Sequence, residues 1–151
     1  MLIGVISDTH GLLRPEALAA LQKVEHILHA GDVGDEQILR DLARLAPVTA
    51  IRGNVDTNGV CSKLPATEAV DLDGHLFYLV HSVRDLDLNP VVAGVNVVVS
   101  GHSHQAGVAW REGVMYLNPG SAGPRRFRLP ITLSLVTTSR AGVSAWIEEL
   151  L

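Results

Sequence analysis

Cysteine, excess positive charge and long apolar segments are all scarce in this sequence. A single cysteine, Cys61, cannot form an internal disulfide, which excludes a disulfide-stabilised secreted domain and predicts a reducing, cytoplasmic location. The 12 Lys and Arg residues against 16 Asp and Glu residues give a net charge of −4, so we expect no large nucleic-acid surface. The apolar residues 1–6 have no basic flank and are followed by Asp8, so we expect neither a signal peptide nor a membrane-spanning segment.

Length and composition predict one domain. With 151 residues, 47% of them hydrophobic, the chain is long enough to bury a core and too short to divide comfortably in two. No repeat, linker or low-complexity tract interrupts it. We therefore assign residues 1–151 to a single domain.

The first half of the chain alternates apolar strands with amphipathic helices. We expect strands at residues 2–7, 26–30 and 48–51, and helices at residues 15–24 and 36–45. Pro15 suits a first helical turn, and Leu18, Leu21 and Val24 recur at helical spacing. Such βαβ alternation predicts a parallel sheet, and open α/β sheets bind ligands outside the carboxyl ends of their strands.

The second half is typical of β-hairpins. Strand patterns at 69–72 and 75–80 flank the turn dipeptide Asp73-Gly74, and those at 108–110 and 114–117 flank a second turn. Further strands are expected at residues 95–99, 131–137 and 143–147. Two sheets packed face to face with helices outside would bury these runs, which predicts an α/β sandwich with its loops on one polar rim.

Polar motifs follow five of the expected strands. They are Asp8-Thr9-His10, Gly31-Asp32, Gly53-Asn54, His81 and Gly101-His102-Ser103-His104. In an extended segment residues two apart point to the same side, so each D-x-H or H-x-H pair would offer two ligands to one region. The glycines would let the backbone turn sharply and approach an ion without a Cβ in the way.

These side chains are metal ligands by type. Carboxylate, imidazole and amide groups without thiolate favour Mn²⁺, Fe²⁺, Zn²⁺ or Ni²⁺ over a purely oxygen-bound Ca²⁺. Ligands gathered from five strand ends could fill two adjacent metal shells, and the positive charge held there is what a phosphate ester needs.

The ordered motif set resembles the calcineurin-like metallophosphoesterase superfamily, and within it the small single-domain prokaryotic phosphodiesterases. In that branch D-x-H, G-D, G-N, a lone His and G-H-x-H follow one another. The resemblance runs from Ile3 to about Arg126 and includes Asn118-Pro119-Gly120-Ser121, similar to the N-P-G-S loop of the branch. It implies a four-layer αββα sandwich of two mixed β-sheets flanked by helices.

The resemblance also implies a two-metal site. One ion would be held by Asp8, His10, Asp32 and His104, and the other by Asp32, Asn54, His81 and His102, with Asp32 as the bridge. We expect two divalent ions, with Mn²⁺ preferred and Ni²⁺, Fe²⁺ or Zn²⁺ as alternatives. The pair would activate a hydroxide that attacks a small phosphate-ester substrate, most readily a phosphodiester.

Two positions depart from the family pattern. Many members carry a histidine after G-N that assists the leaving group, whereas this chain has Val55, followed by Asp56. Small members often carry glycine after the lone ligand histidine, whereas here His81 is followed by Ser82-Val83. The first departure predicts that a dedicated proton donor is absent, and the second predicts a different loop after His81.

Other polar residues have simpler interpretations. His29 could orient Asp32, but a buried hydrogen-bonded histidine is the more common case. Asp71-Leu72-Asp73-Gly74 lacks the later glutamate of a calcium loop and is typical of a hairpin turn. Residues 125–128, Arg-Arg-Phe-Arg, could clamp a phosphate or form a solvated basic cluster. His26, His75 and Cys61 are assigned no functional role.

An alternative function belongs to a different class. A structural relative of the family is a scaffold subunit of a eukaryotic sorting coat, so the same fold can serve as a protein-binding module. All seven ligand types are intact here, which favours the enzyme. Small family members often form oligomers, so a homo-oligomer is also compatible with the resemblance.

Overall fold

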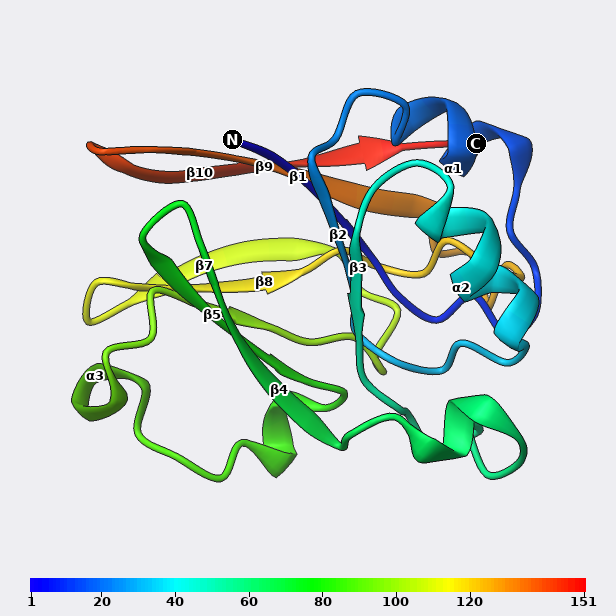
Figure 1. The fold of residues 1–151 in the computed structure, drawn as a ribbon, viewed down its shortest axis with the longest axis horizontal. Helices are drawn as coiled ribbons and strands as arrows, with labels where there is room; N and C mark the ends of the chain where they lie inside the picture. The colour runs from blue at the N-terminus through cyan, green and yellow to red at the C-terminus, as the bar shows by residue number, and fades with distance from the viewer.

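The computed structural model describes residues 1–151, which form two mixed five-stranded β-sheets packed face to face (Figure 1). In strand order the first sheet contains β10 (Gly142–Glu149), β9 (Thr132–Ser139), β1 (Leu2–Ile6), β2 (His26–His29) and β3 (Val48–Ala50). Strands β1, β2 and β3 are parallel, as the alternation of strand and helix predicts, and β9 and β10 pair antiparallel beside them.

The second sheet contains β4 (Thr67–Leu72), β5 (His75–Val80), β6 (Val97–Val99), β8 (Val114–Asn118) and β7 (Gly107–Arg111), in that order. Its three central strands are parallel, and the two edge strands β4 and β7 each come from a hairpin. The turn between β4 and β5 is built as the sequence predicts, because Asp73 and Gly74 both have positive φ. The Gly74 amide donates to the Asp71 carboxylate, so this segment is a hairpin turn.

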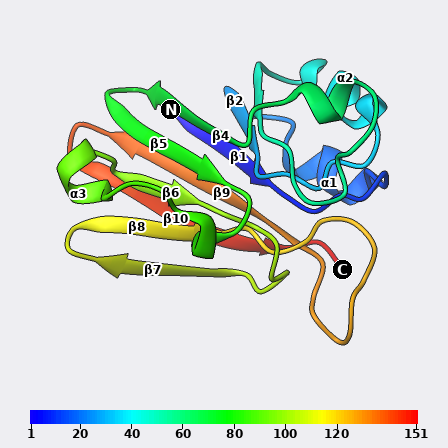
Figure 2. The ribbon, with the colours of Figure 1, turned by 90° about the horizontal axis from the view of Figure 1, so that it is seen from below.

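Helices cover the two sheets unequally. Helix α1 (Pro15–Ala20) and helix α2 (Glu36–Ala43) lie together beside β1, β2 and β3, whereas the single turn α3 (Pro90–Ala93) lies on the opposite side of the molecule (Figures 1 and 2). Two 3₁₀ turns, Val60–Lys63 and Val83–Asp85, complete the elements. The predicted αββα order is therefore present, with a thin helical layer over the second sheet. No helix of the chain has the length and apolar character needed to cross a membrane.

Three apolar clusters hold these layers together. The central one packs Ile3, Val5 and Leu28 of the first sheet against residues of the second such as Phe77 and Val99. A second cluster fills the space between the first sheet and helices α1 and α2, and a smaller third one covers the outer face of the second sheet. The apolar strand runs are therefore buried on both faces, as continuous runs in a sandwich require.

The first helix is shorter than the 15–24 segment that periodicity predicts. It ends at Ala20, and the following residues form tighter bonds from Gln22 to Ala19 and from Val24 to Leu21. Val24 keeps its predicted burial against the helix-side core, although it is no longer helical. The chain must turn here because β2 begins at His26 and pairs with β1.

Candidate metal centre

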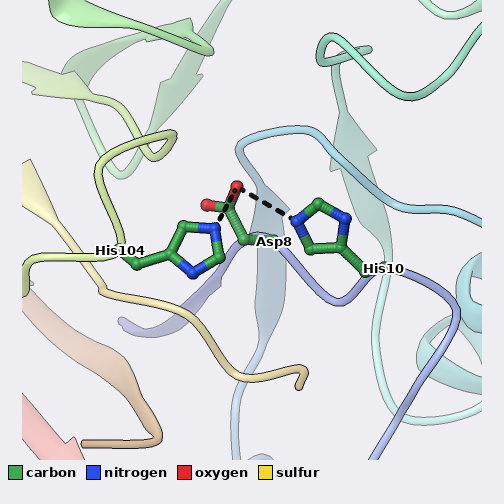
Figure 3. A group of neighbouring side chains, drawn as sticks. All are labelled: Asp8, His10 and His104. Atoms are coloured by element: carbon green, nitrogen blue, oxygen red, sulfur yellow. Dashed lines mark ion pairs between the residues drawn. The ribbon is translucent and has the colours of Figure 1, made fainter. Parts of the chain in front are cut away.

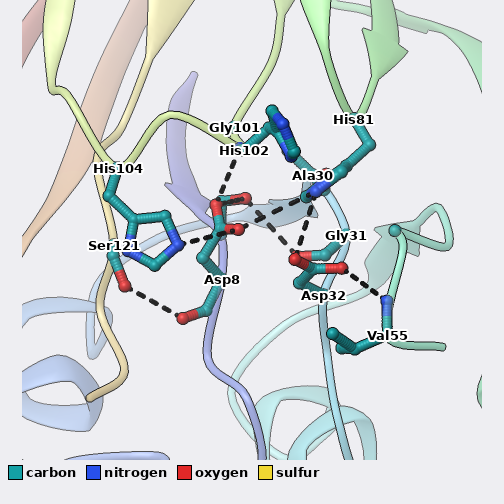
Figure 4. Close-up of polar contacts among 12 residues, drawn as sticks. Asp8, Ala30, Gly31, Asp32, Val55, His81, Gly101, His102, His104 and Ser121 are labelled. Carbon is teal, nitrogen blue, oxygen red and sulfur yellow. Dashed lines mark hydrogen bonds and ion pairs between the residues drawn. The ribbon is translucent and has the colours of Figure 1, made fainter. Parts of the chain in front are cut away.

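Five of the seven predicted ligands converge where the strand ends of the two sheets meet. Asp8 Oδ1 lies 3.4 Å from His104 Nε2 and 3.8 Å from His10 Nε2 (Figure 3). Asp32 Oδ2 lies 3.2 Å from His81 Nε2 and 3.6 Å from His10 Nε2. Asp8 Oδ1 is also 3.9 Å from His81 Nε2, so the two carboxylates face the same imidazoles (Figure 4).

These side chains form two overlapping sets that could hold an ion. One set is Asp8, His10 and His104, and the other is Asp8, Asp32 and His81; within each set the ligand atoms lie within 4.8 Å of one another. Asp32 lies beside one histidine of each implied metal set, as a bridging carboxylate should. Asp8 shares that property, because its Oδ1 approaches His81 as well as His104.

The other two predicted ligands, Asn54 and His102, border this cluster on its open side. The His102 ring packs edge-on against the His81 ring with their centroids 5.3 Å apart, and its backbone amide donates to Asp8 Oδ2. Asn54 lines a cavity of about 340 Å³ together with His81. Both side chains are exposed, whereas Asp8, Asp32, His81 and His104 are buried.

The donor set fits a divalent cation. Buried polar atoms are almost always hydrogen-bonded, yet Asp8 Oδ1 and the Nε2 atoms of His10, His81 and His104 are buried without a partner. Asp8 Oδ1 lies within 3.9 Å of each of the three nitrogens, and cations bound by the two sets would satisfy these atoms. The second ring nitrogen of His81 contacts the Ala30 carbonyl at 2.8 Å, the arrangement that typically orients a metal-binding histidine.

The backbone reaches this geometry in a different way from the extended segments that the spacing suggests. Asp8 and His10 have φ of 55° and 47°, and His102 and His104 have φ of 69° and 61°. Left-handed conformations are uncommon outside glycine, and they concentrate at functional sites where surrounding structure enforces them. Spacing therefore predicted the shared region of Asp8 and His10 correctly, but the extended geometry was wrong.

Two of the motif glycines are required by close approach between loops. A Cβ on Gly53 would overlap the carboxylate and amide of Asp32, and one on Gly101 would overlap Ser7 Oγ and crowd Asp8 Oδ2. Each glycine therefore lets one ligand loop lie against the carboxylate of another. The predicted need for glycine holds, because each Cβ would meet a ligand carboxylate, and at Gly101 also the Ser7 hydroxyl.

Asp56 joins two of the ligand loops, a role that sequence reasoning missed. Its buried carboxylate accepts backbone N–H groups from Gly53 at 2.9 Å, Gly34 at 2.9 Å and Val33 at 3.1 Å. Both carboxylate oxygens of Asp56 are thus engaged as acceptors of backbone N–H groups, which gives this residue a structural role. Its position directly after G-N-V was the only signal available in the sequence.

Three more side chains fix the loop that carries Asp8 and the loop that carries His102. Ser7 Oγ donates to Asp8 Oδ2 at 2.7 Å. Ser121 Oγ donates to the Asp8 carbonyl at 3.0 Å (Figure 4). Asn118 Nδ2 donates to the Gly101 carbonyl and to Ser103 Oγ, each at 3.1 Å. The Asn118-Pro119-Gly120-Ser121 motif thus supports both loops. Asp32 is oriented separately, by the Val55 amide at 3.0 Å.

The electrostatics of the cluster favour positive charge between its carboxylates. Burial raises the pKa of Asp8 above its ordinary value, and burial lowers the pKa of His104. Burial also opposes the charged forms of Asp32 and His81, but their mutual contact outweighs it, so the pKa of Asp32 is lowered and that of His81 is raised. A proton on His81 therefore balances part of the negative charge of the two carboxylates, and a divalent ion would balance more of it.

His29 is a buried, fully hydrogen-bonded histidine, as its more common interpretation predicts. Its Nδ1 accepts the Gly31 amide at 3.1 Å, and its Nε2 lies 3.0 Å from Thr9 Oγ1, which donates to the Val33 carbonyl. Because the ring is completely buried, its pKa falls to about 4 and it stays neutral. His29 thus joins the loops of Asp8 and Asp32 without facing the ligand atoms.

The remaining candidates contribute no ligand atom to either of the two sets. His26 and His75 contact Thr49 and the Ser139 carbonyl, respectively, and Cys61 is a buried free thiol. The basic segment 125–128 is exposed; Arg125 donates to the Leu129 carbonyl, and Arg126 is close enough to His104 to oppose its protonation.

Comparisons with known proteins identify the family of this chain. Residues 1–141 match the model of the calcineurin-like phosphoesterase superfamily domain. A probable metallophosphoesterase of Methanothermobacter thermautotrophicus is 36% identical over 148 residues, covering 89% of this chain and 85% of the relative.

Solved structures show the same fold. A novel archaeal phosphodiesterase has a TM-score of 0.75 at 23% identity, with 98% of this chain and 100% of that one covered. Zinc-bound Vps29 from Entamoeba histolytica has a TM-score of 0.76 at 20% identity, with both chains fully covered. At these identities the two likenesses concern the fold alone, whereas the matched family model covers most of the sequence. The chain therefore belongs to the calcineurin-like phosphoesterase superfamily.

Proposed function

We propose that this protein is a divalent-metal-dependent phosphodiesterase with two ions bound by the seven side chains that the motifs supply. This proposal rests mainly on four buried ligand atoms without hydrogen-bond partners: Asp8 Oδ1 and, within 3.9 Å of it, the Nε2 atoms of His10, His81 and His104. When bound, two ions of this kind supply Lewis acidity and lower the pKa of water towards neutrality. The mixed oxygen and imidazole ligands suit Mn²⁺, Fe²⁺, Zn²⁺ or Ni²⁺, and among these we propose Mn²⁺.

The proposed assignment gives each side chain a role. Asp8, His10, Asp32 and His104 bind one ion, and Asp32, Asn54, His81 and His102 bind the other. The buried members fix the distance between the ions, and the exposed Asn54 and His102 border the side that substrate approaches. The Val55 amide and the Ala30 carbonyl hold Asp32 and His81 in orientation.

A phosphodiester is the proposed substrate class on the likeness to phosphodiesterases, and the chain has no obvious acid for a poor leaving group. Val55 stands after Asn54 with an exposed apolar side chain, and Asp56 is committed to three backbone amides. Substrates with good leaving groups should therefore react best. An archaeal phosphodiesterase of the same fold supports this class.

The test is a metal and activity screen. Protein stripped with a chelator and reloaded separately with Mn²⁺, Ni²⁺, Fe²⁺ or Zn²⁺ would be assayed on bis(p-nitrophenyl) phosphate and on p-nitrophenyl phosphate. We expect Mn²⁺ to restore hydrolysis of the diester in preference to the monoester. Failure of all four ions to support hydrolysis of either ester would contradict the proposal.

A second candidate function is a protein-binding scaffold on the same fold. The full-length likeness to Vps29 supports it. The screen separates the two candidates, because a scaffold binds metal without turnover. The sequence-based proposals of a single domain, a cytoplasmic location and a homo-oligomer accompany the enzyme assignment and are tested by limited proteolysis, cell fractionation and analytical ultracentrifugation.

A further inference from the structure

Two cavities on one side of the candidate metal centre join into a groove. The first, of about 260 Å³, is lined by His102 and Arg84, and the second, of about 470 Å³, is lined by Arg111 and Tyr116. The two share Val83, Ser100 and Asn118 in their linings, so they adjoin. We call this hollow the β7–β8 groove, because those strands form its far end. It begins at a predicted metal ligand and leads away along the second sheet.

Two arginines in the β7–β8 groove have no carboxylate partner. The side-chain ion pairs that arginines form in this chain are Arg40 with Glu36 and Arg44 with Asp41, so Arg84 and Arg111 are both free. The Arg111 guanidinium lies over the Tyr116 ring, 5.2 Å from its centroid. Stacking of this kind holds a guanidinium in place while leaving its N–H groups available to an anion.

The position of Arg111 sets the length of the ligand. Tyr116 is two residues along β8 from Asn118, which contacts the Gly101 carbonyl beside His102. At about 3.4 Å per strand residue, Tyr116 lies roughly 7 Å back along β8 from Asn118, and the Arg111 guanidinium lies 5.2 Å from the Tyr116 ring. Between the two ends the lining mixes apolar Val83 and Val108 with the amide of Gln105. A nucleoside-sized group fits such a site, which has few polar groups on an apolar wall.

The cavity on the other side of the centre has the opposite charge. It is lined by Asn54 and His81 together with Asp85 and Asp87, and its one arginine, Arg52, donates to the Leu64 carbonyl. An anionic group would be repelled there and attracted into the β7–β8 groove. Charge therefore decides which of the two cavities receives an anionic ester arm.

We propose that the β7–β8 groove binds one arm of a small phosphodiester, a nucleoside-sized group that carries a second phosphate, with Arg111 as the residue that binds this phosphate. The proposal rests on the proposed phosphodiesterase function and specifies its substrate. The groove is short and its basic groups are few, so the ligand is a dinucleotide-sized molecule and not a long polynucleotide.

Calorimetry on Mn²⁺-supplemented full-length protein tests the subsite without turnover. We expect thymidine 3′,5′-bisphosphate to bind about tenfold more tightly than thymidine 5′-monophosphate, because a phosphate gains charge-assisted hydrogen bonds from Arg111. Arg111→Ala should abolish this advantage, whereas Arg140→Ala, which removes an exposed arginine from the β9–β10 turn, should keep it. Fructose 1,6-bisphosphate carries two phosphates but no base, so it measures how much the base contributes to binding. We expect it to bind more weakly than thymidine 3′,5′-bisphosphate.

Kinetics with matched esters tests the subsite separately from the proposed phosphodiesterase function. The substrates are bis(p-nitrophenyl) phosphate and the p-nitrophenyl ester of thymidine 5′-phosphate, with and without a 3′-phosphate. Arg111→Ala should lower kcat/KM about tenfold for the 3′-phosphorylated ester only. Equal effects on all three esters, or no bisphosphate advantage in the wild type, would overturn the subsite while leaving the hydrolase intact. A bisphosphate advantage without hydrolysis of any ester would keep the subsite and overturn the phosphodiesterase.

Discussion

The two sheets contribute different halves of the candidate metal centre. The first sheet supplies both carboxylates, Asp8 after β1 and Asp32 after β2, and it is sealed by two helices over a continuous apolar core. The second sheet supplies His81 after β5 and His102 and His104 after β6, and only one helical turn and a 3₁₀ turn lie on its side. The covered sheet fixes the oxygens, and the sparsely covered sheet leaves room for substrate.

The supporting contacts follow the same division. On the first-sheet side, Asp56 accepts three backbone amides and His29 connects two loops, so this wall is held by buried hydrogen bonds. On the second-sheet side, His102 is exposed and borders the β7–β8 groove. Substitutions on the first-sheet side, at Asp56 or His29, should therefore affect the metal-binding loops. Substitutions in the β7–β8 groove should affect substrate choice.

The largest expected effect follows from removing the carboxylate shared by both implied metal sets. Asp32→Ala should lose both ions and reduce turnover by more than the ~100-fold that loss of a supporting group typically costs. His104→Ala should weaken mainly one ion. Metal content by atomic emission, measured beside turnover, checks this difference. Full occupancy and full activity in Asp32→Ala would disprove the bridging role, and equal losses in Asp32→Ala and Asp8→Ala would show that the carboxylates share it.

The next effect concerns the leaving group. Without a proton donor at Val55, hydrolysis rates should depend steeply on leaving-group pKa, and aryl diesters should react far faster than alkyl diesters. Val55→His should raise the alkyl rates by up to ~100-fold, within the ~10²–10⁴-fold range of general acid catalysis. A series of diesters assayed with Mn²⁺ measures both slopes. A flat wild-type dependence would mean that another residue, such as His10, already donates the proton.

A smaller effect should follow from weakening the hydrogen bonds of Asp56 on the first-sheet side. Asp56→Asn replaces one acceptor oxygen by an amide NH₂ opposite backbone N–H groups, so the loops of Asp32 and Asn54 should loosen. We expect metal affinity to fall about 10- to 100-fold. Asp35→Asn is the matched control, because asparagine caps helix α2 as well as aspartate does. Titration with Mn²⁺ compares the two variants. Equal Mn²⁺ affinities would show that Asp56 does not support the metal-binding loops.

The smallest effect on activity is expected at His29, where stability should change instead. The folded pKa of about 4 lies below the ordinary value of 6.5, so the buried ring contributes stability that is complete above pH 6.5. That stability should be lost as the pH falls from 6.5 towards 4, by about 3 kcal/mol. His29→Gln removes the titration, so urea unfolding should show a flatter pH dependence in the variant. Parallel curves for both proteins would be inconsistent with the buried neutral ring.

Much of the fold was predictable because its signals are local. Apolar runs and turn dipeptides such as Asp73-Gly74 gave the strands and hairpins, and the alternation of strand and helix gave the parallel half. The end of helix α1 was wrong, because pairing of β2 with β1 overrides the periodicity that continues to Val24. The short turn Pro90–Ala93 was not anticipated, since one helical turn leaves no periodic pattern.

The candidate site was predictable only as a set of residues. Motif spacing identified the seven side chains, and five of them meet within a few ångströms. Spacing could not show the left-handed backbone at Asp8 and His104, because the loops that enforce it come from distant parts of the chain. The role of Asp56 was hidden for the same reason: two of the amides it accepts, Val33 and Gly34, belong to a loop more than twenty positions earlier.

Electron paramagnetic resonance of Mn²⁺-loaded protein tests most directly whether ligand side chains contributed by both sheets hold a pair of ions. Two ions that share a carboxylate lie roughly 3.5–4 Å apart, as in two-metal hydrolytic sites, and their spins couple. We expect a coupled spectrum at two equivalents of Mn²⁺ per chain, lost in Asp32→Ala. A spectrum of isolated Mn²⁺ at saturation, or saturation at one equivalent, would contradict the account.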